Sequence, residues 1–194
     1  GQPVNAQDVV FTWQSVVNPK INVTTRPPGM TNIDSADTPD DFTVVFHLKT
    51  AQAPWLLTWV SQAILPKHVL DGQDMNTAAW NTKPTVTDGP FVFGEWVSGS
   101  YILVKKNPNY FLSEPNLDQI IYRVTPDSNA LLASQQKGEI DMRYAMTADQ
   151  VQIVDKLPDW TVTRTPSHSV FHFTINTANP LMSDKAVRQA LTYA

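Results

Sequence analysis

The stretch FVFGEWVSGSYILV, residues 91–104, decides the fold class because it predicts a β-hairpin in the middle of the chain. The aromatic and β-branched runs at 91–93 and 101–104 are typical of strands. Residues 97–100, Val-Ser-Gly-Ser, separate them and favour a tight turn. Helical patterns lie on both sides of this hairpin, so the sequence predicts a mixed α/β or α+β fold.

On the N-terminal side of the hairpin, the clearest pattern is a helix at 6–17. Asn5 and Asp8 form a capping signal in front of it, and Val9, Trp13 and Val16 recur at helical spacing. The remaining predictions before the hairpin are a Pro- and Asp-rich loop at 19–41, a strand at 43–48, a helix from Pro54 to Val60, and a polar connection at 71–89.

On the C-terminal side, strand and helix patterns continue to alternate. Asp127 is placed to cap a helix that ends before Gly138, and Thr147 with Gln150 fits a capping box. Ser183 is a plausible N-cap for a last helix. The predicted strands are 120–124, 140–144, 161–163 and 170–175, and the predicted helices are 127–136, 147–157 and 183–194.

Composition excludes several classes of protein. The chain has 194 residues, no Cys and a net charge of −4, so it lacks a disulfide framework and the broad basic surface of a general nucleic-acid binder. No run of about 18 apolar residues is present that could span a membrane. With 42% hydrophobic residues, the chain is too apolar to be disordered.

The sequence holds no convincing catalytic or metal-binding set. His168 and His172 share a face of a predicted strand, but two ligands are too few for zinc, so packing or hydrogen bonding is favoured. Asp40-Asp41 precedes a strand and is expected to be solvated, and Glu139 with Asp141 is expected to be structural. Phosphate-binding loops and the GxSxG and HExxH motifs are absent.

The aromatic residues allow two interpretations. Trp55 and Trp59 lie one turn apart on one helix face, where they either pack in the core or form a stacking platform at a ligand cleft. Tyr144 ends a predicted short strand, where it either touches a ligand or packs at the rim.

Six segments, in order along the chain, resemble motifs of the peptide- and nickel-type solute-binding proteins of ABC importers. They are GQPVNAQDVVFTW at 1–13, ILPKHVL at 64–70, DGPF at 88–91 with Trp96, VKKNPNYF at 104–111, GEID at 138–141, and INT at 175–177 with Pro180 and VRQALTYA at 187–194. Each motif alone is weak, but the ordered set covers essentially the whole chain.

The resemblance implies a fragment of a type II periplasmic-binding-protein-like fold that covers most of the first lobe. Residues 1–85 would form the smaller subdomain of that lobe and 86–177 its sheet subdomain. Residues 178–194 would leave the hinge and begin the second lobe. The abrupt C-terminal helix fits this expectation of an excised piece, although a natural C-terminal helix is the alternative.

The resemblance also implies a function and a set of contacts. The chain would belong to a substrate-binding component that delivers peptides or similar small solutes to a membrane permease, without enzymatic activity, metal or cofactor. It would be an extracytoplasmic monomer, held at the membrane only by an anchor outside this chain, and would bind no nucleic acid. A regulatory domain with the same fold, or less plausibly a hydrolase, is the alternative. The expected ligand contacts are Trp59, Gly89, Pro90, Tyr144 and His172.

Overall fold

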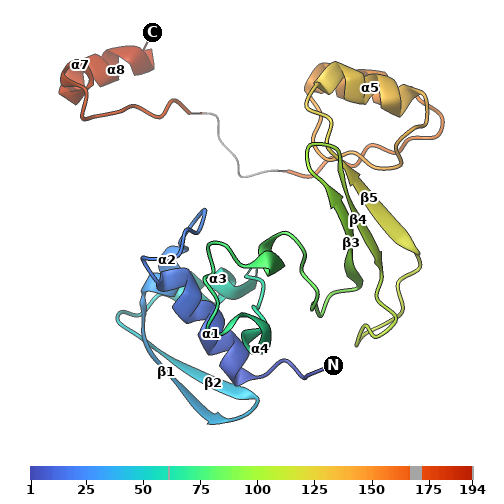
Figure 1. Ribbon diagram of the computed structural model, residues 1–194. Coiled ribbons are helices and arrows are strands. Elements are labelled where there is room, and N and C mark those ends of the chain that lie inside the picture. Colours follow the sequence, from blue (N-terminus) through green and yellow to red (C-terminus); the bar gives the residue numbers. More distant parts are fainter. Residues whose placement is uncertain (61, 167–171, 194) are drawn as a thin grey trace. The chain divides into compact units, whose positions relative to one another are not determined.

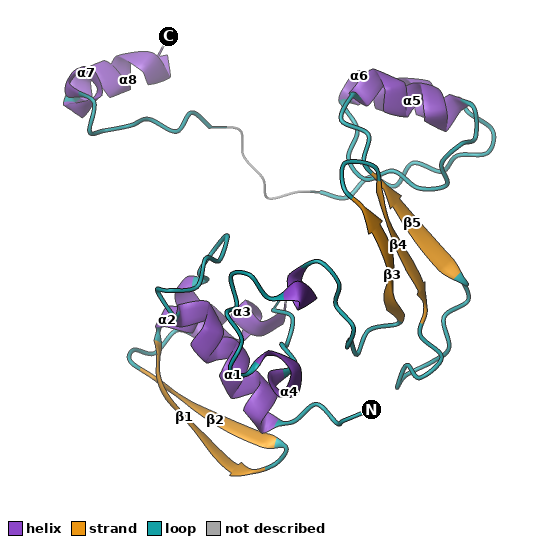
Figure 2. Cartoon of the chain, viewed as in Figure 1, coloured by secondary structure: helices purple, strands orange, loops and turns teal. Residues whose placement is uncertain are grey.

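The computed structural model describes residues 1–60, 62–166 and 172–193, and it contains the expected mixture of helices and strands (Figures 1 and 2). The chain divides into two units, Gly1–Pro126 and Asp127–Ala194, called unit 1 and unit 2 below. The helices of unit 1 are α1 (Ala6–Val17), α2 (Pro28–Thr31), α3 (Leu57–Val60) and α4 (Lys67–Leu70), with 3-10 turns η1 (Ala53–Leu56) and η2 (Ala79–Asn81). Its strands are β1 (Ile33–Asp40), β2 (Thr43–Leu48), β3 (Phe91–Val97), β4 (Tyr101–Lys106) and β5 (Gln119–Arg123).

Helix α1 begins where its capping signal predicts. The Asn5 side chain accepts hydrogen bonds from the backbone N–H groups of Gln7 and Asp8, and the Asp8 carboxylate accepts one from the backbone N–H of Asn5. This reciprocal arrangement is a capping box, which satisfies donors that the first helical turn leaves unpaired. The predicted helix at 6–17 is therefore confirmed at both ends.

The prediction of a loop at 19–41 is wrong, because α2 and β1 both lie within it. Strand β1 reads IDSADTPD and pairs antiparallel with the predicted strand β2, placing Ala36 opposite Phe46. Its composition is typical of turns, and it is a strand because β2 offers an adjacent backbone edge. The β1–β2 pair forms a two-stranded sheet beside α1 (Figure 1).

The core of unit 1 forms where α1, α2 and β1 meet. Val16, Met30 and Ile33 are buried there. Four aromatic rings and two aliphatic side chains pack around them: Trp13, Phe46, Trp55, Trp59, Val17 and Leu48. Two of the tryptophans also fix α2 by polar contacts, since their indole N–H groups donate to the carbonyls of Gly29 and Met30.

The central hairpin is confirmed and gains a third strand. Strands β3 and β4 pair antiparallel with Phe93 opposite Val104, and β5 pairs with β4 with Tyr122 opposite Ile102. A bulge interrupts the β3–β4 register between Phe93 and Glu95, and such a bulge increases local twist. The strand order is β3-β4-β5.

Unit 2 contains α5 (Ser128–Gln136), α6 (Ala148–Val154), α7 (Pro180–Ser183) and α8 (Lys185–Tyr193). The predicted cap of α5 is confirmed, because an Asp127 carboxylate oxygen accepts from the backbone N–H of Ala130 at 2.7 Å. Gly138 follows this helix with φ +70°, a conformation that glycine adopts without strain. The capping box predicted at Thr147 is wrong, since its side chain makes no capping hydrogen bond to α6.

Three later predictions fail in unit 2. Residues 140–144 and 161–163 are not strands, and neither are 172–175, while 170–171 lie outside the described residues. An extended segment becomes a strand only where its backbone finds a partner, and the side chain of Arg143 instead ties its segment to two helices. Ser183 does not cap the last helix as predicted, because it is the final residue of α7. The Asp184 carboxylate instead accepts from the backbone N–H of Ala186 at the start of α8.

The described residues include no helix long and apolar enough to cross a membrane. The boundary between the two units falls after Pro126. The subdomain boundaries inferred from the resemblance, after residues 85 and 177, remain predictions.

Candidate functional site

Trp59 lies in α3 among the aromatic side chains of unit 1. Its ring stacks on Phe46 with centroids 5.0 Å apart and meets Trp55 edge-to-face at 6.5 Å. Packing against the core is one of the two interpretations that the sequence allows for this pair. The Trp59 indole N–H is nevertheless buried without a hydrogen-bond acceptor. Its role as a ligand contact remains a prediction.

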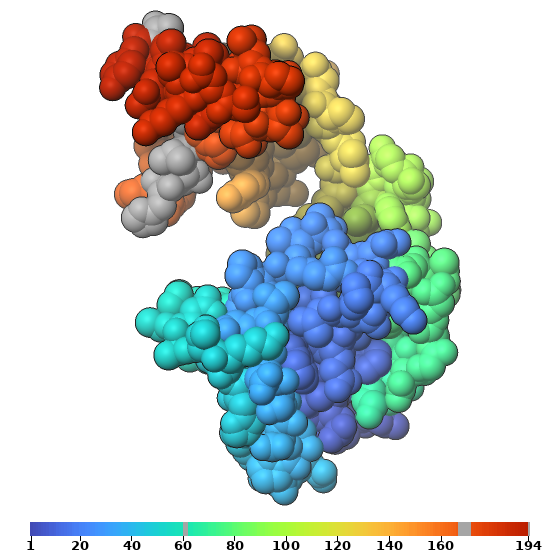
Figure 3. All heavy atoms as spheres, turned by 90° about the vertical axis from the view of Figure 1, so that its left-hand side faces the viewer, coloured from blue at the N-terminus to red at the C-terminus, as the bar shows by residue number. Residues whose placement is uncertain are grey.

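The surface next to Trp59 is apolar and exposed. Leu56 and Leu57, in η1 and α3, are both about two thirds exposed (69% and 68%). The cyan segment that contains them stands out from the surrounding surface in the space-filling view (Figure 3). The helix thus places Trp59 on the core while its leucines face outward.

Gly89 and Pro90 are held by Asn107 immediately before β3. The Asn107 side-chain amide donates to the carbonyl of Gly89 at 2.8 Å, and its backbone N–H donates to the carbonyl of Pro90 at 2.9 Å. Asn107 is itself buried. Nearby, the Lys106 ammonium donates hydrogen bonds to the carboxylates of Glu114 and Asp118, which raise the pKa of Lys106 above its usual 10.5. The turn after β4 therefore fixes the entry to β3.

Tyr144 is almost fully exposed, at 92%. It lies in unit 2, in the loop between α5 and α6. The next residue, Ala145, has φ +59°, a left-handed conformation that is uncommon for residues other than glycine. The structure thus places a bare aromatic ring on a loop with a defined and unusual backbone.

The fifth predicted contact, His172, follows the gap at 167–171 and is exposed in unit 2. Its predicted neighbour on a strand face, His168, lies outside the described residues. Trp59, Gly89 and Pro90 are therefore in unit 1, and Tyr144 and His172 are in unit 2.

The group that holds the Tyr144 loop was missed by sequence reasoning. Arg143 donates to the side-chain oxygens of Gln135, Gln150 and Ser128, at 3.4, 2.6 and 3.2 Å. Gln135 and Gln150 are both buried. The pattern Thr147-x-x-Gln150 predicts a cap within α6, whereas the Gln150 side chain donates to the hydroxyl of Ser128 at the start of α5.

Two of the carboxylates that the sequence singles out, Asp40 and Glu139, serve local structure. An Asp40 oxygen accepts from the backbone N–H of Phe42 at 2.8 Å, which together with Thr43 lowers the pKa of Asp40 below its usual 3.8. Glu139 accepts from the hydroxyl of Ser134 at 2.8 Å. Across the described ranges, no three His, Asp or Glu side chains are grouped to hold a metal ion.

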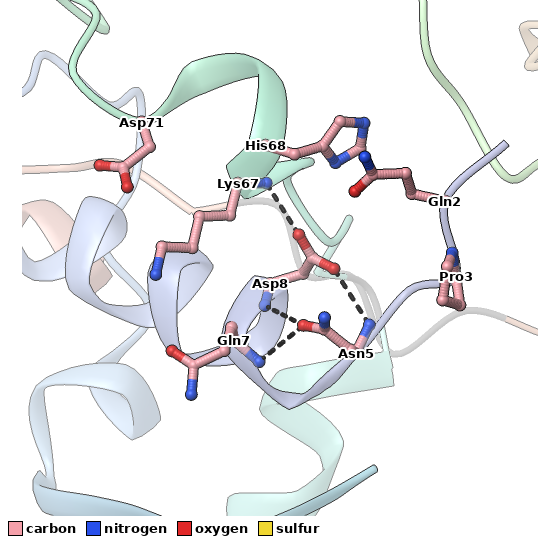
Figure 4. A pocket seen from close by; sticks show the side chains of 8 residues that line it. All are labelled: Gln2, Pro3, Asn5, Gln7, Asp8, Lys67, His68 and Asp71. Carbon is pink, nitrogen blue, oxygen red and sulfur yellow. Dashed lines mark hydrogen bonds between the residues drawn. The ribbon is translucent and has the colours of Figure 1, made fainter. Parts of the chain in front are cut away.

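A polar hollow of about 320 Å³ lies beside the start of α1, yet it contains none of the predicted contacts. Figure 4 shows Asp8 at its centre, between the backbone N–H of Lys67 (2.8 Å) and that of Asn5 (3.0 Å). Deeper along α1, the buried Thr12 hydroxyl accepts from the backbone N–H of Leu65 and donates to the carbonyl of Asp8. Both oxygens of Asp8 are thus used to hold the chain, so this carboxylate has a structural role.

Comparison with known proteins places the whole chain within longer relatives. A family model described as "Bacterial extracellular solute-binding proteins, family 5 Middle" matches residues 1–194. The oligopeptide-binding protein AppA of Bacillus subtilis is 34% identical over 198 residues, which cover 100% of this chain and 36% of AppA. The chain therefore spans little more than a third of this relative.

Solved structures agree with that match. NikZ from Campylobacter jejuni, in complex with Ni(L-His), superimposes with a TM-score of 0.86 at 26% identity, covering 98% of this chain and 38% of NikZ. AppA from Bacillus subtilis, in complex with a nonapeptide, gives 0.79 at 30% identity, covering 99% and 38%. The fold is thus that of part of a type II periplasmic binding protein, as the sequence predicts.

Proposed function

The chain belongs to family 5 of the bacterial extracellular solute-binding proteins, and from this premise we propose that it forms part of the substrate-binding component of an ABC importer. It binds a peptide or a similarly small solute, and the complete protein delivers that solute to a membrane permease. Binding is reversible and needs no covalent chemistry, so the chain is not an enzyme. It acts outside the cytoplasm as a monomer, anchored through a segment other than this one.

The observation that carries this proposal is the exposure of Tyr144 on a loop that Arg143 holds in place. A tyrosine that is 92% exposed would ordinarily be free to move, yet the loop that carries Tyr144 is tied to two helices through Arg143. Binding sites commonly use exposed loop residues held by a rigid scaffold. An aromatic ring supplies a large contact area at low entropic cost, because it has few rotatable bonds.

Trp59, Gly89, Pro90 and His172 complete the proposed set of ligand contacts. The buried, unpaired indole N–H of Trp59 and the fixed backbone at Gly89 and Pro90 are compatible with this role. The relatives suggest two ligand chemistries, since AppA was solved with a nonapeptide and NikZ with nickel and histidine. Peptides are the first choice, because the AppA sequence is the more similar of the two.

The test is a calorimetric titration of the chain with tetra-alanine, nona-alanine and the nickel–histidine complex. We expect peptide binding, and we expect Tyr144→Ala to weaken it about tenfold, the loss of one well-packed aromatic contact. Tyr193→Ala is the matched control, because Tyr193 is also highly exposed in unit 2. Binding of none of the probes, or equal effects of the two substitutions, would contradict the proposal.

A further inference from the structure

Arg143 is surrounded by neutral acceptors rather than by an acidic partner. Its two terminal nitrogens donate to the amide oxygens of Gln135 and Gln150 and to the hydroxyl of Ser128. Within the described part of the chain, Arg143 forms no ion pair with a carboxylate. Its Nε atom is buried and has no acceptor.

This arrangement gives Arg143 little electrostatic stabilisation, but it fixes the relative positions of the groups that the guanidinium contacts. A half-buried guanidinium without a counter-charge gives up part of its hydration. Its planar fork, however, can bridge several acceptors in one fixed orientation, which a lysine ammonium cannot do. Gln150 completes the group by donating to the hydroxyl of Ser128 at 2.8 Å, so the start of α5 and the first turn of α6 are joined at Arg143.

The residues on either side of Arg143 show that it holds the backbone of the loop at 142–146. Met142 and Tyr144 are 82% and 92% exposed, so neither is fixed by packing of its own side chain. Ala145 has the left-handed backbone that costs free energy in residues with a β-carbon. On the far side, the Met146 sulfur lies 4.0 Å from the side-chain nitrogen of Gln135. The exposed ring is therefore bracketed by two attachments to the same buried glutamine.

We propose that Arg143 is a positioning residue, which fixes the backbone at 142–146 and so orients Tyr144 before any ligand arrives. The part of this inference that concerns affinity rests on the proposed function of Tyr144, whereas the part that concerns loop order does not. Preorganisation of this kind lowers the entropic cost of binding, because the backbone that carries the ring is already ordered in the free protein.

The first experiment measures loop order without a ligand, by ¹⁵N relaxation of the full chain. We expect the backbone order parameters of Tyr144 and Ala145 to be about 0.85 in the unchanged protein and to fall below about 0.6 in Arg143→Met. Arg164→Met is the matched control, because Arg164 is a more exposed arginine of unit 2 that pairs with Asp155. Order that is unchanged in Arg143→Met, or lost equally throughout α5 and α6, overturns the proposal.

Arg143→Lys keeps the test decisive if the methionine variant does not fold. Lysine retains the charge but cannot bridge three acceptors, so we expect the same loop-specific loss of order. Full order in the lysine variant would show that charge alone suffices, and would overturn the positioning role.

The second experiment is a double-mutant cycle with tetra-alanine as the probe. We expect Arg143→Met to weaken binding about tenfold when Tyr144 is present and to have no further effect in Tyr144→Ala, because coupled residues are not additive. Additive losses would overturn the claim that Arg143 acts through Tyr144. A Tyr144→Ala variant that binds normally would instead contradict the proposed function and leave the loop-order result standing.

Discussion

Asp8 joins two segments of unit 1 that lie 59 residues apart in the sequence. Asp8 is only 7% exposed, and each oxygen of its carboxylate accepts from a backbone N–H, one at Asn5 and one at Lys67. Hydrogen bonds to a charged acceptor contribute more than neutral ones, and a buried donor left unpaired is costly. This residue therefore joins the start of α1 to the start of α4.

Asp8→Asn should destabilise unit 1 by about 1.5–3 kcal/mol, because the amide replaces one acceptor with a donor that faces another N–H group. The measurement is urea unfolding followed by tryptophan fluorescence, since unit 1 holds Trp13, Trp55 and Trp59. Asp41→Asn, at an exposed turn carboxylate, should change the free energy of unfolding by less than about 0.5 kcal/mol. Equal losses in both variants would mean that the Asp8 contacts are unimportant.

At the scale of residues, the sequence indicates candidate contact residues, but it does not reveal their burial or their hydrogen-bond partners. Tyr144 is indicated by its place at the end of a predicted short strand and by the family resemblance, and the structure adds that the residue is exposed and its loop anchored. Sequence reasoning could not decide between the two interpretations of Trp59, because helical spacing is the same for a core residue and a cleft residue. It missed Arg143, whose role depends on acceptors from two other elements that local patterns do not reveal.

At the scale of elements, predictions succeeded where the signal was local. Helices α1 and α5 carry their caps within four residues, and the β3–β4 hairpin carries its own turn. Strand β1 was missed because its eight residues resemble a turn until β2 pairs with them. The strand predicted at 140–144 failed for the opposite reason, since its residues favour a strand but no backbone edge pairs with them in the described chain.

The packing of α2 against α3 gives a prediction at this scale. A β-carbon added to Gly29 would overlap the hydroxyl oxygen of Thr58 and would lie 2.9 Å from the β-carbon of Thr58. Contacts this short force the two helices apart, so Gly29→Ala should cost about 1–3 kcal/mol, as overpacked cores do. Displacement would also strain the bond from the Trp55 indole to the carbonyl of Gly29.

Thr58→Ala provides the compensating change for that variant. It removes the closest atom, and the double variant should recover part of the stability lost in Gly29→Ala, measured as the midpoint of thermal unfolding. Thr58→Ala alone supplies the reference. A double variant no more stable than Gly29→Ala would show that the close approach is not the cause.

At the scale of the whole molecule, the two units have separate buried centres. Met30 in unit 1 and Val154 in unit 2 are both fully buried. Met30→Ala should destabilise unit 1 by about 2–5 kcal/mol, and Val154→Ala should destabilise unit 2 by about 1.5 kcal/mol, the value of two buried methyl groups. Amide hydrogen exchange, read separately for residues 1–126 and 127–194, measures each effect. Loss of protection in both units from either substitution would show that they unfold as one.

The hydrogen bond between the Asp8 carboxylate and the backbone of Lys67 also has a consequence for the order in which unit 1 folds. It spans 59 residues, and the bond from Leu65 to Thr12 spans 53, whereas β1 and β2 meet across a short turn. Closing a long loop costs more entropy than closing a short one, so the hairpin should form first and the Asp8 contact late. An interaction that forms after the folding transition state changes the unfolding rate and leaves the folding rate nearly unchanged. Asp8→Asn should therefore accelerate unfolding while the refolding rate stays nearly constant. This carboxylate would thus control the lifetime of folded unit 1 and not the speed at which unit 1 folds.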